Sequence, residues 1–133
     1  MSDKPTPPTG PGTFCWMELM TTDTARSKDF YTKLLGWTTQ EMDMGPMGTY
    51  TMFQVNGQPF CGMMKIAPEM GPVPPHWLSY IAVEDVDAKA TQARELGATI
   101  LAPPADIPNV GRFAVLADPT GAAVALFKGN CKD

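Results

Sequence analysis

Hydrophobic and polar positions along the chain predict a strand–helix–three-strand unit that occurs twice in the sequence. In the first copy, a strand at residues 12–21 leads to Asp23, a typical helix N-cap, and Gly36 ends the helix. Three short strands are then expected at residues 37–42, 49–55 and 59–66. The dipeptide Asn56-Gly57 favours a tight hairpin between the last two. Apolar residues at helical spacing predict the buried stripe of the helix: Phe30, Tyr31, Leu34 and Leu35.

The second copy follows the first at a constant offset. A strand at residues 77–83 precedes Asp85, which stands 62 positions after Asp23 and can cap a helix that Gly97 ends. The remaining strands are expected at residues 99–101, 112–117 and 122–127. A proline-rich loop separates the first two of these, and a DPTG turn precedes the last. This repeat predicts an α+β fold of two tandem βαβββ modules that pack together around a shared core or cavity.

The repeat also sets the expected domain organisation. At 133 residues we expect one domain overall, because the chain is too short for two independent cores. Segments rich in proline and glycine do not sustain regular elements, so they mark the ends and the middle of the chain. The expected parts are a flexible N-terminal segment at 1–12, a first module at 13–67, a linker at 68–75, a second module at 76–128 and a tail at 129–133.

Composition and charge exclude several classes of partner. The net charge is −4 and no segment is rich in basic residues, so nucleic acid is not an expected partner. No apolar run reaches the roughly 18–20 residues that span a bilayer, and the first residues lack the apolar core of a signal peptide. We therefore expect a cytoplasmic protein that does not bind membranes. Cys15, Cys61 and Cys131 lack CxxC spacing, which favours reduced thiols over disulfides or a zinc site.

Four segments carry a resemblance to a known family: FYTKLLGW, VNGQPFCGMM, SYIAVEDVDA and GRFAVLADPTGAAVALF. In this order they resemble the vicinal-oxygen-chelate superfamily of glyoxalase I, bleomycin-resistance proteins and extradiol dioxygenases, and the likeness covers residues 12–128. The resemblance is to a glyoxalase-like branch. It implies that the modules form a curved, cup-shaped mixed sheet with the helices outside and a ligand pocket inside the cup. It also favours a homodimer.

Metal-using members of that superfamily hold a divalent ion with His, Gln or Glu side chains from the first and last strand of each module. Counted from the helix cap and from the hairpin turn, these positions are Trp16, Met63, Leu78 and Ala125 in this chain. An indole, Leu and Ala offer no ligand atom, and a thioether favours soft metals such as Cu(I). The sequence therefore lacks the usual metal ligands, and we expect neither a metal ion nor another cofactor.

Two polar residues are candidates for chemistry in such a pocket. Strand alternation places Glu18 on the same face as Trp16, where a partly desolvated carboxylate can act as a general acid or base. Its alternative role is that of a polar anchor or a structural partner. His76 is the only histidine and lies just before the fifth strand, as either a catalytic group or an ordinary loop residue.

The other predicted pocket residues are apolar or soft. Besides Trp16 they are Met20, Met52, Cys61, Met63, Leu78, Tyr80, Ala125 and Phe127. Such a lining suits a small hydrophobic or aromatic molecule, so we expect a binding protein without metal. The open alternative is a lyase, isomerase or dioxygenase-type enzyme acting on a small carbonyl or aromatic compound, through Glu18 or through an unrecognised metal site. A third hypothesis is a protein-interaction role with the cup as scaffold.

Overall fold

The computed structural model describes residues 9–45, 48–67, 73–107 and 110–129. The chain divides into two compact units, which we call the first module, Trp16–Leu78, and the second module, Ser79–Asp133 together with Met1–Cys15. The boundaries between them fall inside the first and the fifth strand. Most of the predicted linker and tail, and the first eight residues of the predicted N-terminal segment, lie outside the described residues.

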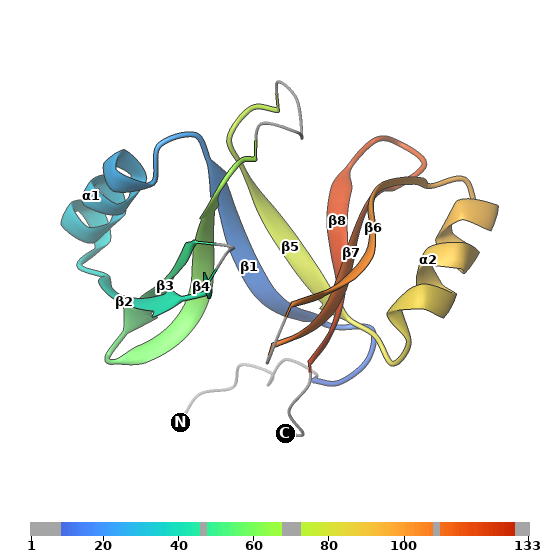
Figure 1. Cartoon of the computed structure of the whole chain (residues 1–133), viewed down its shortest axis with the longest axis horizontal. Helices are drawn as coiled ribbons and strands as arrows, with labels where there is room; N and C mark the ends of the chain where they lie inside the picture. The colour runs from blue at the N-terminus through green and yellow to red at the C-terminus, as the bar shows by residue number, and fades with distance from the viewer. Residues whose placement is uncertain (1–8, 46–47, 68–72, 108–109, 130–133) are drawn as a thin grey trace, which may run out of the picture. The chain divides into compact units, whose positions relative to one another are not determined.

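The first module contains one helix and four strands (Figure 1). They are β1 (Phe14–Thr21), α1 (Thr24–Leu35), β2 (Thr38–Asp43), β3 (Thr49–Val55) and β4 (Gln58–Lys65). The strand order is β2-β3-β4-β1, with β1 parallel to β4 and the other neighbours antiparallel. The predicted caps form α1: the Asp23 carboxylate accepts from the Arg26 N–H at 3.0 Å, and Gly36 is left-handed at φ 74°.

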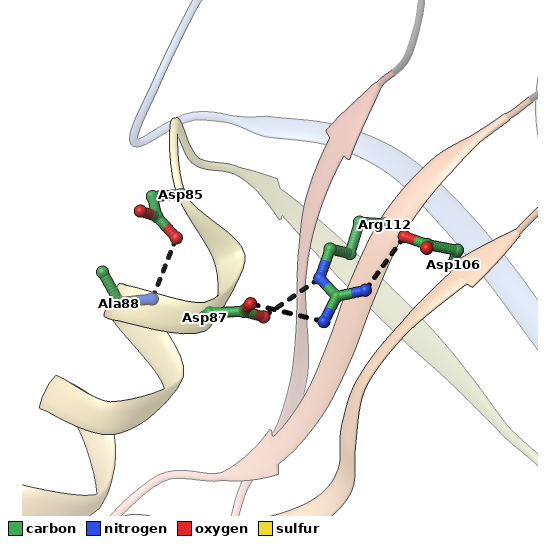
Figure 2. Close-up of polar contacts among 5 residues, drawn as sticks. All are labelled: Asp85, Asp87, Ala88, Asp106 and Arg112. Atoms are coloured by element: carbon green, nitrogen blue, oxygen red, sulfur yellow. Dashed lines mark hydrogen bonds and ion pairs between the residues drawn. The ribbon is translucent and has the colours of Figure 1, made fainter.

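The second module repeats this order (Figure 1). Its elements are β5 (His76–Ala82), α2 (Val86–Glu95), β6 (Thr99–Ile107), β7 (Gly111–Ala117) and β8 (Ala123–Gly129). The strand order is β5-β8-β7-β6, with β5 parallel to β8 and the other neighbours antiparallel. Asp85 caps α2 by accepting from the Ala88 N–H at 3.0 Å (Figure 2). Two copies of one mixed βαβββ unit confirm the predicted α+β fold class.

The predicted proline-rich loop is wrong, because β6 continues through it to Ile107. Pro103 and Pro104 stand inside this strand. The strand lies at the end of its sheet and pairs only with β7 in the strand order, so a residue without an N–H is tolerated there. Register shifts near Ala102 accommodate the prolines.

The core of the first module lies between α1 and one face of its sheet. Leu19, Phe53, Cys61 and Met63 are buried together, and Met17, Tyr31 and Trp37 pack against them. Tyr31 belongs to α1, and its ring stacks on Trp37 with the centroids 5.5 Å apart. The odd-numbered residues of β1 therefore face the helix, and the even-numbered residues, including Glu18, face the opposite side.

An arginine joins the helix of the second module to its sheet (Figure 2). Arg112 of β7 donates to both carboxylate oxygens of Asp87 on α2, at 3.0 and 3.3 Å, and to Asp106 of β6 at 2.9 Å. The hydrogen bonds to Asp87, which have the larger effect, and to Asp106 raise the pKa of Arg112. Arg112 keeps 37% of its side chain exposed, so this network orients the elements more than it stabilises them.

Among the described residues, no helix is long and apolar enough to cross a membrane.

Candidate functional site

Strand pairing decides which side chains of the first module lie on the sheet face opposite α1. In the parallel β1–β4 pair, Glu18 lies beside Gly62 and Leu19 lies beside Met63. Neighbouring paired residues project to the same face, and Leu19 and Met63 belong to the core under α1. Glu18 and Gly62 therefore project to the other face, which we call the helix-free face. Its central residues are Trp16, Glu18, Met20, Tyr50, Met52, Gly62 and Met64.

The prediction that Cys61 and Met63 share a face with Trp16 is wrong. Both are 1% exposed, and they lie in the core under α1. The position of Met63 was counted from its hairpin turn in the same way as that of Ala125. The same count does not reach equivalent positions, because the two hairpins differ. The β3–β4 hairpin has a two-residue turn and a register shift that makes Phe60 an extra residue of β4. In the second module, five residues join β7 to β8. A slip of one residue moves every side chain to the opposite face, so Gly62 takes the place expected for Met63.

A hydrogen-bonded chain of three side chains surrounds the Glu18 carboxylate. The Trp16 Nε1–H donates to the Tyr50 hydroxyl at 2.9 Å, and that hydroxyl donates to Glu18 Oε1 at 3.1 Å. Glu18 is only 3% exposed, whereas Trp16 and Tyr50 are half-buried. A carboxylate this deeply buried depends on hydrogen-bond donors for its stability, and Tyr50 supplies one.

Gly62 leaves the space that the Tyr50 hydroxyl occupies. A Cβ atom at this position would overlap the Oη and Cζ atoms of Tyr50. Glycine inside a strand weakens the strand, and it is found where another group approaches the backbone closely. The contact of Tyr50 with Glu18 therefore depends on the absence of a side chain at residue 62.

Methionine side chains surround this polar chain. Met20 is 7% exposed and pairs with Met64 across the β1–β4 ladder, whereas Met52 lies opposite Gly62 in the β3–β4 ladder. Met52 and Met64 are partly buried. Thioether side chains are flexible and polarizable, so this surface can adapt to an irregular or flat apolar partner.

Sequence reasoning missed Tyr50, Gly62 and Met64. Alternation along β3 from Met52 could have indicated Tyr50, because residues two apart share a face. The glycine inside a predicted strand was a second available signal. Met64 required the correct register of β4, which local sequence did not provide.

The predicted residues of the second module share the face opposite α2. Tyr80 pairs with Ala125 and Ala82 pairs with Phe127, and the rings of Tyr80 and Phe127 are 6.1 Å apart at 76°. The other face, with Leu116 and Leu126, meets α2 in a shallow groove of about 280 Å³. Leu78, which is the last residue of the first module and lies two residues before Tyr80 on β5, is 4% exposed.

His76 begins β5 and interacts with the backbone. Its Nδ1 lies 2.9 Å from the carbonyl oxygen of Pro74. This contact holds the ring at the start of the strand.

Cys61 is unsuited to nucleophilic chemistry. Burial and, as the smaller cause, the negative charge of Glu18 across the sheet together raise the pKa of its thiol to about 11. The thiolate is the reactive form, so Cys61 stays protonated at neutral pH. Its place in the core agrees with that inert state.

The residues present do not fit a metal centre of the His, Gln or Glu type. After the register correction, the four positions are Trp16, Gly62, Leu78 and Ala125, and none offers a ligand atom. The Trp16 N–H is a donor, and the Tyr50 hydroxyl accepts its hydrogen bond. Within the parts of the chain that the structure describes, no group of three or more His, Cys, Asp or Glu side chains is arranged to hold an ion.

Comparison with known proteins gives the same fold and a family. The model of the Glyoxalase/Bleomycin resistance protein/Dioxygenase superfamily matches residues 13–126. Putative glyoxylase CFP32 of Mycobacterium bovis is 39% identical over 121 residues, which cover 90% of this chain and 46% of that protein. Anthracycline biosynthesis protein DnrV of Streptomyces peucetius is 33% identical over 130 residues, covering 89% of this chain and 47% of that protein. The chain thus spans about half the length of the curated relatives it matches.

Solved structures support the fold alone, because their sequence identity is low. Methylmalonyl-CoA epimerase from Mycobacterium tuberculosis superposes with a TM-score of 0.62 at 16% identity, covering 90% of this chain and 89% of that one. The hypothetical protein BH1468 from Bacillus halodurans gives a TM-score of 0.65 at 12% identity, covering 92% and 97%.

Proposed function

The chain belongs to the glyoxalase/bleomycin resistance protein/dioxygenase superfamily, and from this premise we propose that it binds a small hydrophobic or aromatic molecule without a metal ion. The binding surface is the helix-free face of the first module. The observation that carries the proposal is the buried Glu18 carboxylate, held by Tyr50 among methionine side chains. Glu18 is the polar anchor of the ligand, and the thioethers supply the apolar contact.

The hydrogen bonds around Glu18 suit a ligand that carries a hydroxyl or amine group. A carboxylate oxygen has two lone pairs, so Glu18 can accept from a ligand while Tyr50 still donates to it. The rings of Trp16 and Tyr50 are half-buried and offer aromatic surface beside the carboxylate. A relative named for anthracycline biosynthesis supports a flat, hydroxylated aromatic as the class of ligand.

The donor chemistry of the chain supports binding without a metal ion. Trp16 and Gly62 stand where metal-using members of the family keep ligands, and both lack a ligand atom. Affinity must then come from apolar contact and from hydrogen bonds. A chelator is expected to leave ligand affinity unchanged.

Replacing Glu18 by glutamine is expected to weaken ligand binding about tenfold. A hydrogen bond to an ionised carboxylate is stronger than one to a neutral amide by about 1.5 kcal/mol. This difference corresponds to roughly one order of magnitude in Kd. Alizarin, a flat dihydroxylated aromatic, is a suitable probe, and quenching of tryptophan fluorescence measures its affinity. Glu41→Gln is the matched control, because Glu41 pairs with Lys28 and its side chain is 51% exposed. Equal affinity of wild type and Glu18→Gln for alizarin would contradict the anchor role.

One observation favours a second candidate, an enzyme acting on a small carbonyl or aromatic compound. The Tyr50 hydroxyl lies between Trp16 and Glu18, so it can carry a proton between the carboxylate and a ligand. In that case Glu18 is the general base. A compound that is turned over by wild type should then be bound but not converted by Glu18→Gln. Full turnover by this variant would remove Glu18 from the reaction.

A further inference from the structure

The hydrogen-bonded chain on the helix-free face has a fixed direction. An indole N–H donates but does not accept, so the Tyr50 oxygen accepts from Trp16 Nε1 at 2.9 Å. The single hydroxyl proton of Tyr50 is then directed at Glu18 Oε1, at 3.1 Å. Both donors of the chain are engaged within it. The chain therefore offers a ligand the acceptor capacity of the Glu18 carboxylate, which complements a donor group.

The charge of this face is negative. Lys65, the only basic residue of the described strands β1 to β4, lies two residues after Met63 and therefore on the side of α1. From Trp16 onward, the residues of these strands that share the helix-free face with Glu18 are neutral: Trp16, Met20, Thr38, Gln40, Met42, Tyr50, Met52, Gln54, Gly62 and Met64. A positively charged ligand on this face meets no like charge from these strands.

Aromatic and thioether groups lie next to the carboxylate. The Nε1 edge of Trp16 and the hydroxyl edge of Tyr50 point into the hydrogen-bonded chain, and both residues are half-buried. The remaining surface of each ring is π surface, which attracts a cation. The thioethers of Met20, Met52 and Met64 are flexible enough to rearrange around a bound group. Such a set of groups suits an organic ammonium ion, whereas a metal ion requires several oxygen, nitrogen or sulfur ligands.

The burial of Glu18 favours a charged ligand over a neutral one. Glu18 is 3% exposed within the folded chain itself, so its dehydration is a cost of folding and not of binding. An opposite charge is attracted more strongly in such surroundings than at the surface, because the effective dielectric constant is lower. A neutral hydroxyl group makes the hydrogen bond but gains none of this attraction. The ammonium group loses part of its own hydration, which the aromatic rings offset in part.

We propose that the ligand of the helix-free face carries a protonated primary or secondary amine on a flat apolar body. This inference rests on the proposed function and specifies its class of ligand. The ammonium N–H donates to Glu18, and the charge lies beside the rings of Trp16 and Tyr50. The body of the ligand contacts the methionines of the face. A quaternary ammonium ion has the charge but no N–H, so it fits this site less well.

Two naphthalene compounds of nearly the same shape test the preference for a charge. At neutral pH, 1-naphthylmethylamine and 1-naphthalenemethanol differ in carrying an ammonium or a hydroxyl group. Isothermal titration calorimetry of the full chain is expected to show about tenfold tighter binding of the amine, which is the factor that one charge-assisted contact supplies. Equal affinities, or tighter binding of the alcohol, would overturn the ammonium inference and leave the proposed function standing. Binding of neither compound would overturn both.

Two variants identify the carboxylate that recognises the charge. Glu18→Gln should reduce the preference for the amine to about threefold or less, because the amide keeps an acceptor but not the charge. Glu41→Gln removes the same charge from a side chain that is 51% exposed, and it should keep the preference at about tenfold. An unchanged preference in Glu18→Gln, or an equal loss in Glu41→Gln, would contradict recognition by Glu18. Circular dichroism checks the fold of both variants, and the comparison of the two compounds on the wild type holds independently of it.

A third compound tests the N–H contact separately from the charge. Trimethyl(1-naphthylmethyl)ammonium keeps the charge but has no N–H to donate. The wild type is expected to bind it about fivefold more weakly than the primary amine, because the hydrogen bond to Glu18 is lost. Equal or tighter binding of the trimethylated compound would overturn the requirement for an N–H donor.

Discussion

Replacing Phe53 by alanine is expected to lower the free energy of unfolding by about 3–5 kcal/mol. Phe53 is fully buried, and its ring lies 5.1 Å from that of Trp37 and 6.0 Å from that of Tyr31. Truncation removes the apolar contacts of the ring and leaves a cavity between α1 and the sheet. Urea unfolding followed by tryptophan fluorescence measures the loss.

Phe14→Ala is the control for this loss, because Phe14 is 67% exposed. Its removal should change the free energy of unfolding by no more than about 0.5 kcal/mol. Equal losses in the two variants would mean that the core of the first module does not centre on Phe53.

Replacing Gly62 by alanine is expected to cost about 2–4 kcal/mol, although alanine is otherwise the better residue in a strand. The added Cβ would overlap the Tyr50 hydroxyl and force the ring away from Glu18. The buried carboxylate then loses the hydrogen bond from Tyr50, and the displaced ring strains its surroundings. Urea unfolding measures the cost, and the shift of the Tyr50 ring is visible by NMR.

A double-mutant cycle identifies the cause of that cost. With Tyr50→Ala already in place, no hydroxyl remains for the Cβ to meet, so Gly62→Ala should then be within about 0.5 kcal/mol of neutral. If Gly62→Ala costs as much in the Tyr50→Ala background as in wild type, the contact between the two residues is not the reason for the glycine.

Local signals in the sequence were sufficient to predict the order of the elements. Asp23 and Asp85 each cap a helix through their own side chain, and Asn56 and Gly57 both adopt positive φ angles in their turn. Such signals act over three or four residues and do not depend on the rest of the fold. The two βαβββ units therefore follow from the sequence alone.

Strand register was not predictable in the same way. The face on which Met63 lies depends on the extra residue at Phe60, and this irregularity arises from the pairing of β3 with β4. The extension of β6 through Pro103 and Pro104 likewise depends on the strand's place at the edge of its sheet. Both features belong to tertiary structure, so local propensity gave no indication of them.

The candidate site was predictable in part. Alternation along β1 placed Glu18 and Trp16 on one face, and the structure brings them together through Tyr50. Tyr50 is 32 residues from Glu18 in the chain, so their contact required the folded sheet. The exposure of Phe30 and Leu34 was also unexpected, because an amphipathic pattern shows which side chains cluster but not what covers them.

The most direct test of the central claim is a titration of the protein, labelled with ¹³C at the methionine methyl groups, with alizarin. Met20, Met52 and Met64 are assigned to the helix-free face, whereas Met63 lies in the core under α1. Neighbouring residues of one strand thus act as probe and internal control. Ligand binding on the helix-free face predicts shifts in the Met20, Met52 and Met64 methyl signals and none in that of Met63. Saturable binding that shifts Met63 and leaves the other three unchanged would contradict the account.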